Sequence, residues 1–168
     1  MRPFHFCASC GSGLDPPDEE GGARCASCRR IWYRNAAPTA GAAIVAGDRV
    51  LVTVRGRVPK KGQIDVPGGF LRPPEDPIAG LRREVAEELG VEIDVSNHDF
   101  IQAAPHTYGD EGDWVLALGF KARLTGGEPR PSDDVAGIRW VGKEELDGLD
   151  WAWPHDLELV RKALRDGA

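Results

Sequence analysis

Residues 69–91 of this chain read GFLRPPEDPIAGLRREVAEELGV. Within this stretch Glu84, Glu87 and Glu88 stand at positions i, i+3 and i+4, so a helix would place their three carboxylates on one face. Like charges on one face repel each other, and a divalent cation converts that repulsion into binding. Clustered oxygen ligands suit Mg²⁺ or Mn²⁺. The alternative is a solvated acidic helix face on which Arg83 and Glu87 form an ordinary surface pair.

The helix is predicted independently of this chemistry. An apolar stripe at helical spacing runs beside the acidic positions and consists of Ile78, Leu81, Val85 and Leu89. Asp76 followed by Pro77 is a helix start signal, and Gly90 is a typical helix end. The preceding residues 67–69, Pro-Gly-Gly, predict a loop without regular structure whose backbone can approach a ligand closely.

The complete spacing resembles the Nudix box, G-x5-E-x7-R-E-U-x-E-E-x-G-U with U aliphatic, and residues 69–91 meet every defined position. The resemblance implies Mg²⁺-dependent hydrolysis of a diphosphate. It implies that Glu84, Glu87 and Glu88 are the metal ligands and that the backbone of Gly69, with that of Gly68, contributes to the same site. It further implies that Arg83 orients a glutamate of the box and that Glu75 has a supporting role. Glu88 is the first candidate for the general base and Asp134 the second.

This implied chemistry is physically reasonable. A pyrophosphate must be neutralised before water can attack phosphorus, and divalent ions held by carboxylates do this while activating water. The sequence shows no serine, cysteine or histidine constellation for covalent catalysis. We therefore expect direct attack by water.

A second motif precedes the box. The four cysteines of the chain form two CxxC pairs separated by fourteen residues, namely Cys7, Cys10, Cys25 and Cys28. Four thiolates at this spacing predict a structural Zn²⁺ site. Two disulfides or a redox CxxC are the alternatives. Nothing like a secretory signal precedes Cys7, and redox folds use a strand–helix context that this segment lacks.

The segment resembles the zinc ribbon found before some Nudix domains, including NADH pyrophosphatases. We expect a zinc ribbon at residues 1–35 and a Nudix domain at residues 36–168. The formal net charge of −6 makes nucleic acid an unlikely partner. No apolar run reaches membrane-spanning length, and we expect a cytoplasmic protein that acts on a small-molecule nucleotide. The sequence does not decide between a monomer and a homodimer.

The remaining pattern predicts an α/β fold. Strands are expected at residues 42–46 and 49–54, which form a hairpin, and at 64–66, 99–104, 114–124 and 138–141. A short helix should begin at residue 143, and a closing helix at 154–165 should face inward with Leu157, Val160 and Leu164. These elements match what the Nudix resemblance implies, an α/β/α sandwich with a mixed sheet.

Substrate choice must depend on residues outside the box. His106 and Tyr108, in an expected loop at residues 106–112, are the candidate pocket residues. Lys61, in the expected loop 56–63, is a candidate phosphate contact or else a solvated surface residue. Trp140, Trp151 and Trp153 either stack on a base or belong to the core.

The SQPWPFP-like motif of NADH pyrophosphatases with a ribbon does not follow the box, where residues 103–108 read AAPHTY. We therefore expect a pyrophosphatase of the ADP-ribose type. Two further hypotheses are a nucleoside triphosphate pyrophosphohydrolase and a non-catalytic Nudix module that senses a nucleotide. A non-hydrolytic member such as an isomerase is a minor option.

Overall fold

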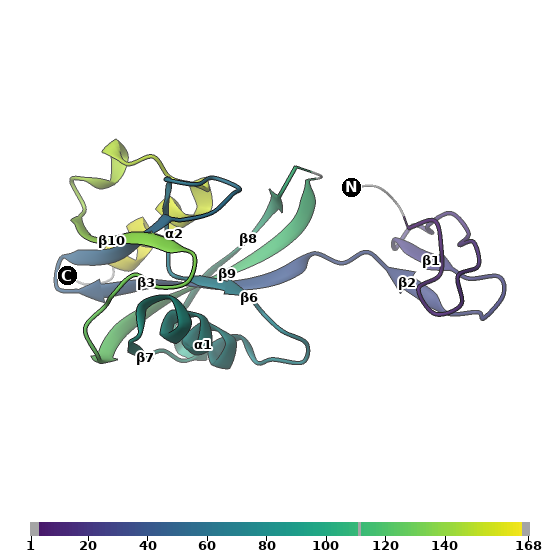
Figure 1. The fold of residues 1–168 in the computed structure, drawn as a ribbon, viewed down its shortest axis with the longest axis horizontal. Helices are drawn as coiled ribbons and strands as arrows, with labels where there is room; N and C mark the ends of the chain where they lie inside the picture. The colour runs from purple at the N-terminus through teal and green to yellow at the C-terminus, as the bar shows by residue number, and fades with distance from the viewer. Residues whose placement is uncertain (1–3, 111, 166–168) are drawn as a thin grey trace.

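The computed structural model describes residues 4–110 and 112–165. The N-terminal part is a two-stranded antiparallel sheet of β1 (Gly22–Arg24) and β2 (Ile31–Tyr33), in which Ala23 faces Trp32. Short turns carrying the cysteines surround it. Figure 1 shows this small unit beyond the end of the long strand β3 (Ala37–Ala46), which connects it to the rest of the chain.

The larger part is built on a mixed sheet. Its central order is β10 (Val135–Gly142), β4 (Arg49–Arg55), β3, β9 (Asp113–Gly126) and β7 (Glu92–Asp94). Strands β3 and β9 run parallel, and the other pairs are antiparallel. Three further strands join this path: β5 (Ile64–Asp65) pairs with β4, β6 (Gly68–Phe70) pairs with β3, and β8 (Phe100–Tyr108) pairs with β9. The expected hairpin of β3 and β4 is confirmed.

Two helices cover the sheet on opposite sides (Figure 1). Helix α1 (Pro77–Leu89) buries its apolar stripe against Ala40, Ala42 and Ile44 of β3. Helix α2 (Pro154–Arg165) packs against the other face, where Ala43 and Val50 are buried. The alternation of β3 between these two clusters follows from the two-residue period of a strand. The expected α/β/α arrangement is therefore present.

The two helices begin and end as their sequences indicate. The Asp76 carboxylate accepts hydrogen bonds from the backbone N–H groups of Ile78 and Ala79, and Gly90 closes α1 with φ of 67°. In α2 the buried face is formed by Leu159, Val160 and Ala163, while the expected Leu157 and Leu164 are only partly buried. The short helix expected from residue 143 is a turn followed by a 3₁₀ helix, η2 (Leu146–Gly148); a second 3₁₀ helix, η1 (Asn97–Asp99), precedes β8.

Two expected loops proved to be strands. The Pro-Gly-Gly segment was expected to lack regular structure, but Gly68–Phe70 forms β6 and pairs with residues 39–41 of β3. The second is the segment 106–108, which continues β8, so that only residues around the tip at 109–112 lie between β8 and β9. Both errors have the same cause, because a partner strand distant in sequence supplies hydrogen bonds that local sequence does not reveal.

Candidate functional site

Arg83 is the centre of the acidic network on α1. Its Nε and Nη2 atoms bind the two carboxylate oxygens of Glu75 at 2.8 and 2.7 Å, and its Nη1 contacts Glu84 at 2.6 Å and Glu87 at 3.0 Å. A bidentate arginine–carboxylate pair fixes both orientation and distance. The pKa of Glu75 is lowered to about 2, and these hydrogen bonds to Arg83 are the largest cause. Arg83 therefore holds the carboxylates of Glu75, Glu84 and Glu87 in defined positions and forms no ion pair with Glu88.

Glu88 lies in a different environment from the other glutamates. Its side chain is 8% exposed, and one carboxylate oxygen accepts the backbone N–H of Gly68 at 2.9 Å. Burial raises the pKa of Glu88 to about 9 despite that hydrogen bond, and the negative charges of Asp134, Asp65 and Glu84 add to the effect. A carboxyl held in its neutral form among other acids becomes an ionised ligand only when a cation joins the group. The donor set therefore fits a hard divalent ion.

Two glycines of β6 allow this close arrangement. Gly68 has φ of 142°, and a Cβ atom there would lie 2.1 Å from the backbone oxygen of Ala40. At Gly69 a Cβ atom would lie 2.7 Å from the carboxylate of Glu84. Only glycine fits both positions, so the backbone of β6 runs directly against the acidic face of α1.

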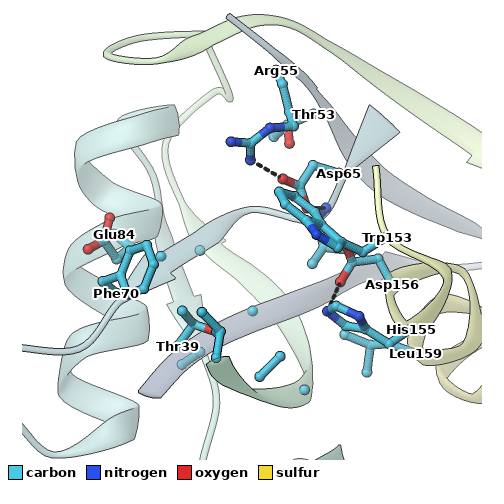
Figure 2. Close-up of a pocket in the computed structure, with 18 of the residues that line it drawn as sticks. Thr39, Thr53, Arg55, Asp65, Phe70, Glu84, Trp153, His155, Asp156 and Leu159 are labelled. Atoms are coloured by element: carbon cyan, nitrogen blue, oxygen red, sulfur yellow. Dashed lines mark hydrogen bonds and ion pairs between the residues drawn. The ribbon is translucent and has the colours of Figure 1, made fainter. Parts of the chain in front are cut away.

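The acidic face opens into a pocket that continues to the start of α2 (Figure 2). Glu84, Glu88, Gly68 and Gly69 line one end, while Glu87 is 42% exposed on its side chain and lies outside the lining. The other end is lined by Tyr108, His106, Trp153, His155 and Asp156. The pocket therefore joins an acidic region to an aromatic region.

Aromatic side chains from β8 and from the start of α2 meet at the second end, and Phe70 of β6, which Figure 2 shows beside Glu84, borders them. Tyr108 lies 5.8 Å from Trp153 with nearly parallel rings, and Phe70 meets Tyr108 edge-on at 5.4 Å. The rings of His106 and His155 are 4.5 Å apart. Burial lowers the pKa of both histidines, that of His155 to about 4, so both imidazoles are neutral at pH 7.

The other expected site residues are placed as follows. Asp134 lines the pocket and pairs with Arg57 at 2.6 Å. Lys61 is exposed and is not among the lining residues. Trp140 and Trp151 are partly buried against the two core clusters, as expected for core aromatic residues, whereas Trp153 lines the pocket.

Several lining residues were not singled out from the sequence. They include Arg55, Asp65, His155 and Asp156, which come from β4, β5 and the first turn of α2. Arg55 pairs with Asp65 at 2.5 Å and lies over the ring of Trp153 at 4.6 Å. One sequence signal could have indicated these pocket residues, the run Trp153-Pro154-His155-Asp156 at a helix start. Its polar and aromatic residues do not belong to the apolar face of the helix, so they are available for a site.

The four cysteines come together in the N-terminal unit. Their sulfur atoms all lie within 4.8 Å of one another, with Cys7–Cys28 at 3.5 Å and Cys10–Cys25 at 3.6 Å. Zinc–sulfur bonds of about 2.3 Å in a tetrahedron give sulfur separations of roughly 3.8 Å, so the arrangement fits a zinc ion. Trp32 donates its indole N–H to Cys7 at 3.3 Å, and the backbone N–H of Cys28 points to Cys25 at 3.5 Å. None of these four cysteines is joined to another in a disulfide in the structure.

Comparison with known proteins agrees with this geometry. The family model described as NUDIX domain matches residues 36–163. The NAD-capped RNA hydrolase NudC of Deinococcus radiodurans is 29% identical over 98% of this chain, and the match spans 58% of that protein's length. A Mycobacterium tuberculosis protein provisionally named 8-oxo-dGTP diphosphatase 2 is 38% identical over 68% of the chain, which spans 83% of that protein.

Solved structures show the same fold. A NUDIX hydrolase from Nitrosomonas europaea superimposes with a TM-score of 0.77 at 21% identity, covering 97% of this chain and 92% of that one. The NUDIX domain of Shewanella oneidensis NrtR, crystallised with ADP ribose, has a TM-score of 0.65 at 18% identity over 81% of this chain and 91% of that one. Among residues 4–110 and 112–165, none of the helices has the length and apolarity needed to cross a membrane.

Proposed function

This chain belongs to the Nudix family, and on that premise we propose that it hydrolyses the pyrophosphate bond of a nucleoside diphosphate joined to a second group. The products are a nucleoside monophosphate and a phosphorylated partner. The observation that supports the proposal is the two-ended pocket, in which the acidic face of α1 continues into an aromatic region beside α2. Such a pocket has room for more than a triphosphate tail.

The divalent cation we propose is Mg²⁺ or Mn²⁺. Glu84, Glu87 and Glu88 would hold it, with the backbone of Gly69 beside them. In support, β6 places Gly69 against Glu84 and Gly68 against Glu88, while Glu87 lies on the more exposed side of the same helix. Ions at this position supply charge neutralisation on the diphosphate and activation of the attacking water.

The protein groups contribute position and proton transfer. Arg83 holds Glu75, Glu84 and Glu87 and so preserves the spacing of the ligands. Glu88 lines the pocket and is our first candidate for the general base, once a bound cation has displaced its proton; Asp134, which also lines the pocket, is the second. Tyr108 and His106 are proposed to contact the substrate beyond the phosphates.

We propose a structural role for the zinc site. All four positions are cysteines, so none is left for water or substrate. The ribbon is too small to bury a core of its own, and bound metal would provide most of its stability.

The test is a product screen with Mg²⁺ over ADP-ribose, NADH, NAD, FAD, nucleotide sugars, dinucleoside polyphosphates and nucleoside triphosphates. We expect a nucleoside monophosphate from a substrate in which a nucleoside diphosphate is joined to a second group. In ¹⁸O water, we expect the label in one of the product phosphates. The variants Glu84→Gln and Glu87→Gln should lose about a hundredfold or more in kcat, the scale for removing a catalytic electrostatic group. A phosphoryl-enzyme trapped during turnover would refute direct attack by water.

A nucleoside triphosphate pyrophosphohydrolase is the second candidate. It is favoured by the Mycobacterium tuberculosis relative, whose name refers to a diphosphatase of a nucleoside triphosphate and which this chain covers over 83% of its length. Release of inorganic pyrophosphate identifies this activity. Nucleotide binding without turnover of any compound in the screen would instead support the non-catalytic sensor.

A further inference from the structure

The pocket is lined by many acidic side chains and few cationic ones. Its acidic residues are Asp65, Glu84, Glu88, Asp133, Asp134 and Asp156. Among the residues that the structure describes, the cationic side chains of the lining are Arg55 and Arg57. His106 and His155 add no positive charge at pH 7, because burial lowers the pKa of each. A protein cation that contacts a phosphate in this pocket must therefore be one of the two arginines.

Arg55 is held by other parts of the fold. Its Nη1 atom lies 2.5 Å from a carboxylate oxygen of Asp65, an ion pair that Figure 2 shows as a dashed line. Its Nε donates to the backbone oxygen of Pro59 at 3.0 Å, and its guanidinium lies 4.6 Å from the centre of the Trp153 ring. With a side chain that is only 13% exposed, Arg55 has a structural role and leaves Arg57 as the candidate.

Arg57 has the opposite character. Its side chain is 64% exposed and lines the pocket, and its Nε atom lies 2.6 Å from Oδ2 of Asp134. This ion pair uses Nε, so the terminal nitrogens still carry N–H donors that can bind another group. The planar fork formed by such donors matches two oxygens of a phosphate. Arg57 can therefore hold Asp134 and a phosphate at the same time.

Asp134 is a fixed anchor for this exposed side chain. Its own side chain is 17% exposed, and its backbone oxygen accepts the N–H of Gly56 at 2.6 Å. The preceding residue Asp133 has φ of 52°, a left-handed conformation that a non-glycine residue keeps only where its surroundings hold it. Two residues before Asp134, the N–H of Ser132 donates to the backbone oxygen of Glu88 at 2.8 Å. The position of Asp134 is therefore set both by the end of β4 and by α1.

We propose that Arg57 binds a phosphate of the substrate and that Asp134 is the residue that positions Arg57 for this contact. The inference rests on the proposed function, because it takes the ligand to be a nucleotide with a diphosphate. An exposed arginine in isolation occupies many rotamers, and ordering it on binding weakens the affinity. The ion pair with Asp134 orders Arg57 in advance. Asp134 thereby has a role different from that of a general base, and the two roles predict different kinetics.

The first test measures binding without turnover. Titration calorimetry with the full chain, purified without chelators and saturated with Mg²⁺, uses α,β-methylene-ADP, whose carbon bridge resists hydrolysis. Arg57→Gln should weaken binding by about tenfold or more, the scale of a lost charge-assisted hydrogen bond. Arg49→Gln is the matched control, because it removes the same charge from an exposed position at the opposite end of β4. It should stay within about twofold of wild type, since distant surface charges are screened.

Variants of Asp134 test whether it acts through Arg57. Loss of a negative charge by itself would strengthen the binding of an anion, whereas loss of the group that orients Arg57 weakens it. Asp134→Ala should therefore weaken the binding of α,β-methylene-ADP by about threefold or more. Asp134→Asn keeps an oxygen that accepts the N–H of Nε and should stay within about twofold of wild type. In the double variant Arg57→Gln/Asp134→Ala the two losses should not add, and the affinity should lie within about twofold of that of Arg57→Gln alone.

The second test separates positioning from proton transfer. With a substrate identified by the product screen, Asp134→Ala should raise KM while kcat stays within about threefold of wild type, because positioning acts on binding. Removing a general base should instead lower kcat by about a hundredfold or more. Such a fall in kcat in both Asp134→Ala and Asp134→Asn would overturn the positioning role.

The binding results and the hydrolysis screen are decided separately. Unchanged or tighter binding in Arg57→Gln or in Asp134→Ala would overturn the inference. So would additive losses in the double variant, an equal loss in Arg49→Gln, or no measurable binding of α,β-methylene-ADP to the wild type. If one of these results accompanies hydrolysis of a compound in the screen, the proposed function stands. If binding behaves as expected and no compound is hydrolysed, the proposed function fails and the phosphate contact stands.

Discussion

The replacement Glu88→Gln is expected to stabilise the metal-free protein while it abolishes the activity. Glu88 is 8% exposed, and its pKa is raised from 4.5 to about 9. An acid with a raised pKa takes up a proton on folding wherever the pH lies between these two values. The resulting penalty is absent below pH 4.5, grows as the pH rises, and is complete above pH 9. The amide of glutamine has no such penalty and can still accept the N–H of Gly68.

The expected gain in the free energy of unfolding follows from the difference between pH 7 and the ordinary glutamate pKa of 4.5. That difference is about 2.5 pH units, and each unit corresponds to about 1.36 kcal/mol, so the variant should gain at most about 3 kcal/mol at pH 7. For a protein of this size, 1 kcal/mol shifts Tm by about 2–4 °C, which predicts an increase of up to roughly 6–12 °C. At pH 5 the gain should fall to about 0.8 kcal/mol.

The measurement is thermal unfolding in EDTA at several pH values between 5 and 8, repeated with Mg²⁺. Mg²⁺ should raise the Tm of the wild type, because a ligand that binds only the folded state stabilises it, and should raise that of the variant less. Glu87→Gln is the matched control: its side chain is 42% exposed, and removing its ion pair should change the stability by no more than about 1 kcal/mol. A Glu88→Gln variant that melts at or below the wild-type temperature in EDTA at pH 7 would refute the argument.

Three further predictions concern the supporting structure. Removal of zinc by a strong chelator should unfold the cysteine-bearing N-terminal unit, seen as loss of hydrogen-exchange protection in residues 7–33, and leave the protection of α1 unchanged; equal loss in both would contradict a purely local role. Glu75→Gln should destabilise the protein above pH 4.5, and the difference from wild type should disappear as the pH falls towards 2, because the lowered pKa of Glu75 means that its pairing with Arg83 is lost on protonation. Gly68→Ala should lower both Tm and kcat, since its Cβ would meet the Ala40 oxygen at 2.1 Å and displace the N–H that binds Glu88; an unchanged kcat would show that β6 does not position that group.

The sequence predicted α1 well because its signals are local. The Asp76 cap, the apolar stripe and the end at Gly90 all lie within the segment they define, and the carboxylates follow from helical spacing. The same holds for the cysteines, whose four sulfur atoms meet as their spacing indicates.

The end of the pocket formed by Tyr108, His106, Trp153 and His155 could not be predicted in the same way. Tyr108 and His106 were identified as pocket residues, but their partners Trp153 and His155 are about fifty positions away and reach them only because α2 packs beside β8. Gln102 of β8 fixes this contact by donating its side-chain N–H to the backbone oxygen of His155 at 2.8 Å. No local pattern contains that information. For the same reason the burial of Asp156, an acidic residue at a helix start, could not be predicted from the sequence.

This difference explains why the box identifies the family but not the substrate. The acidic end of the pocket depends on one continuous segment, β6 to α1, whose spacing is fixed by Gly68, Gly69 and Arg83. The other end of the pocket, where Tyr108, His106, Trp153 and His155 meet, depends on β8 and on the start of α2, and its one aromatic contact with that segment is the edge-on contact of Phe70 with Tyr108. Substitutions there can change the bound group without disturbing the carboxylates, so one fold can serve several substrates.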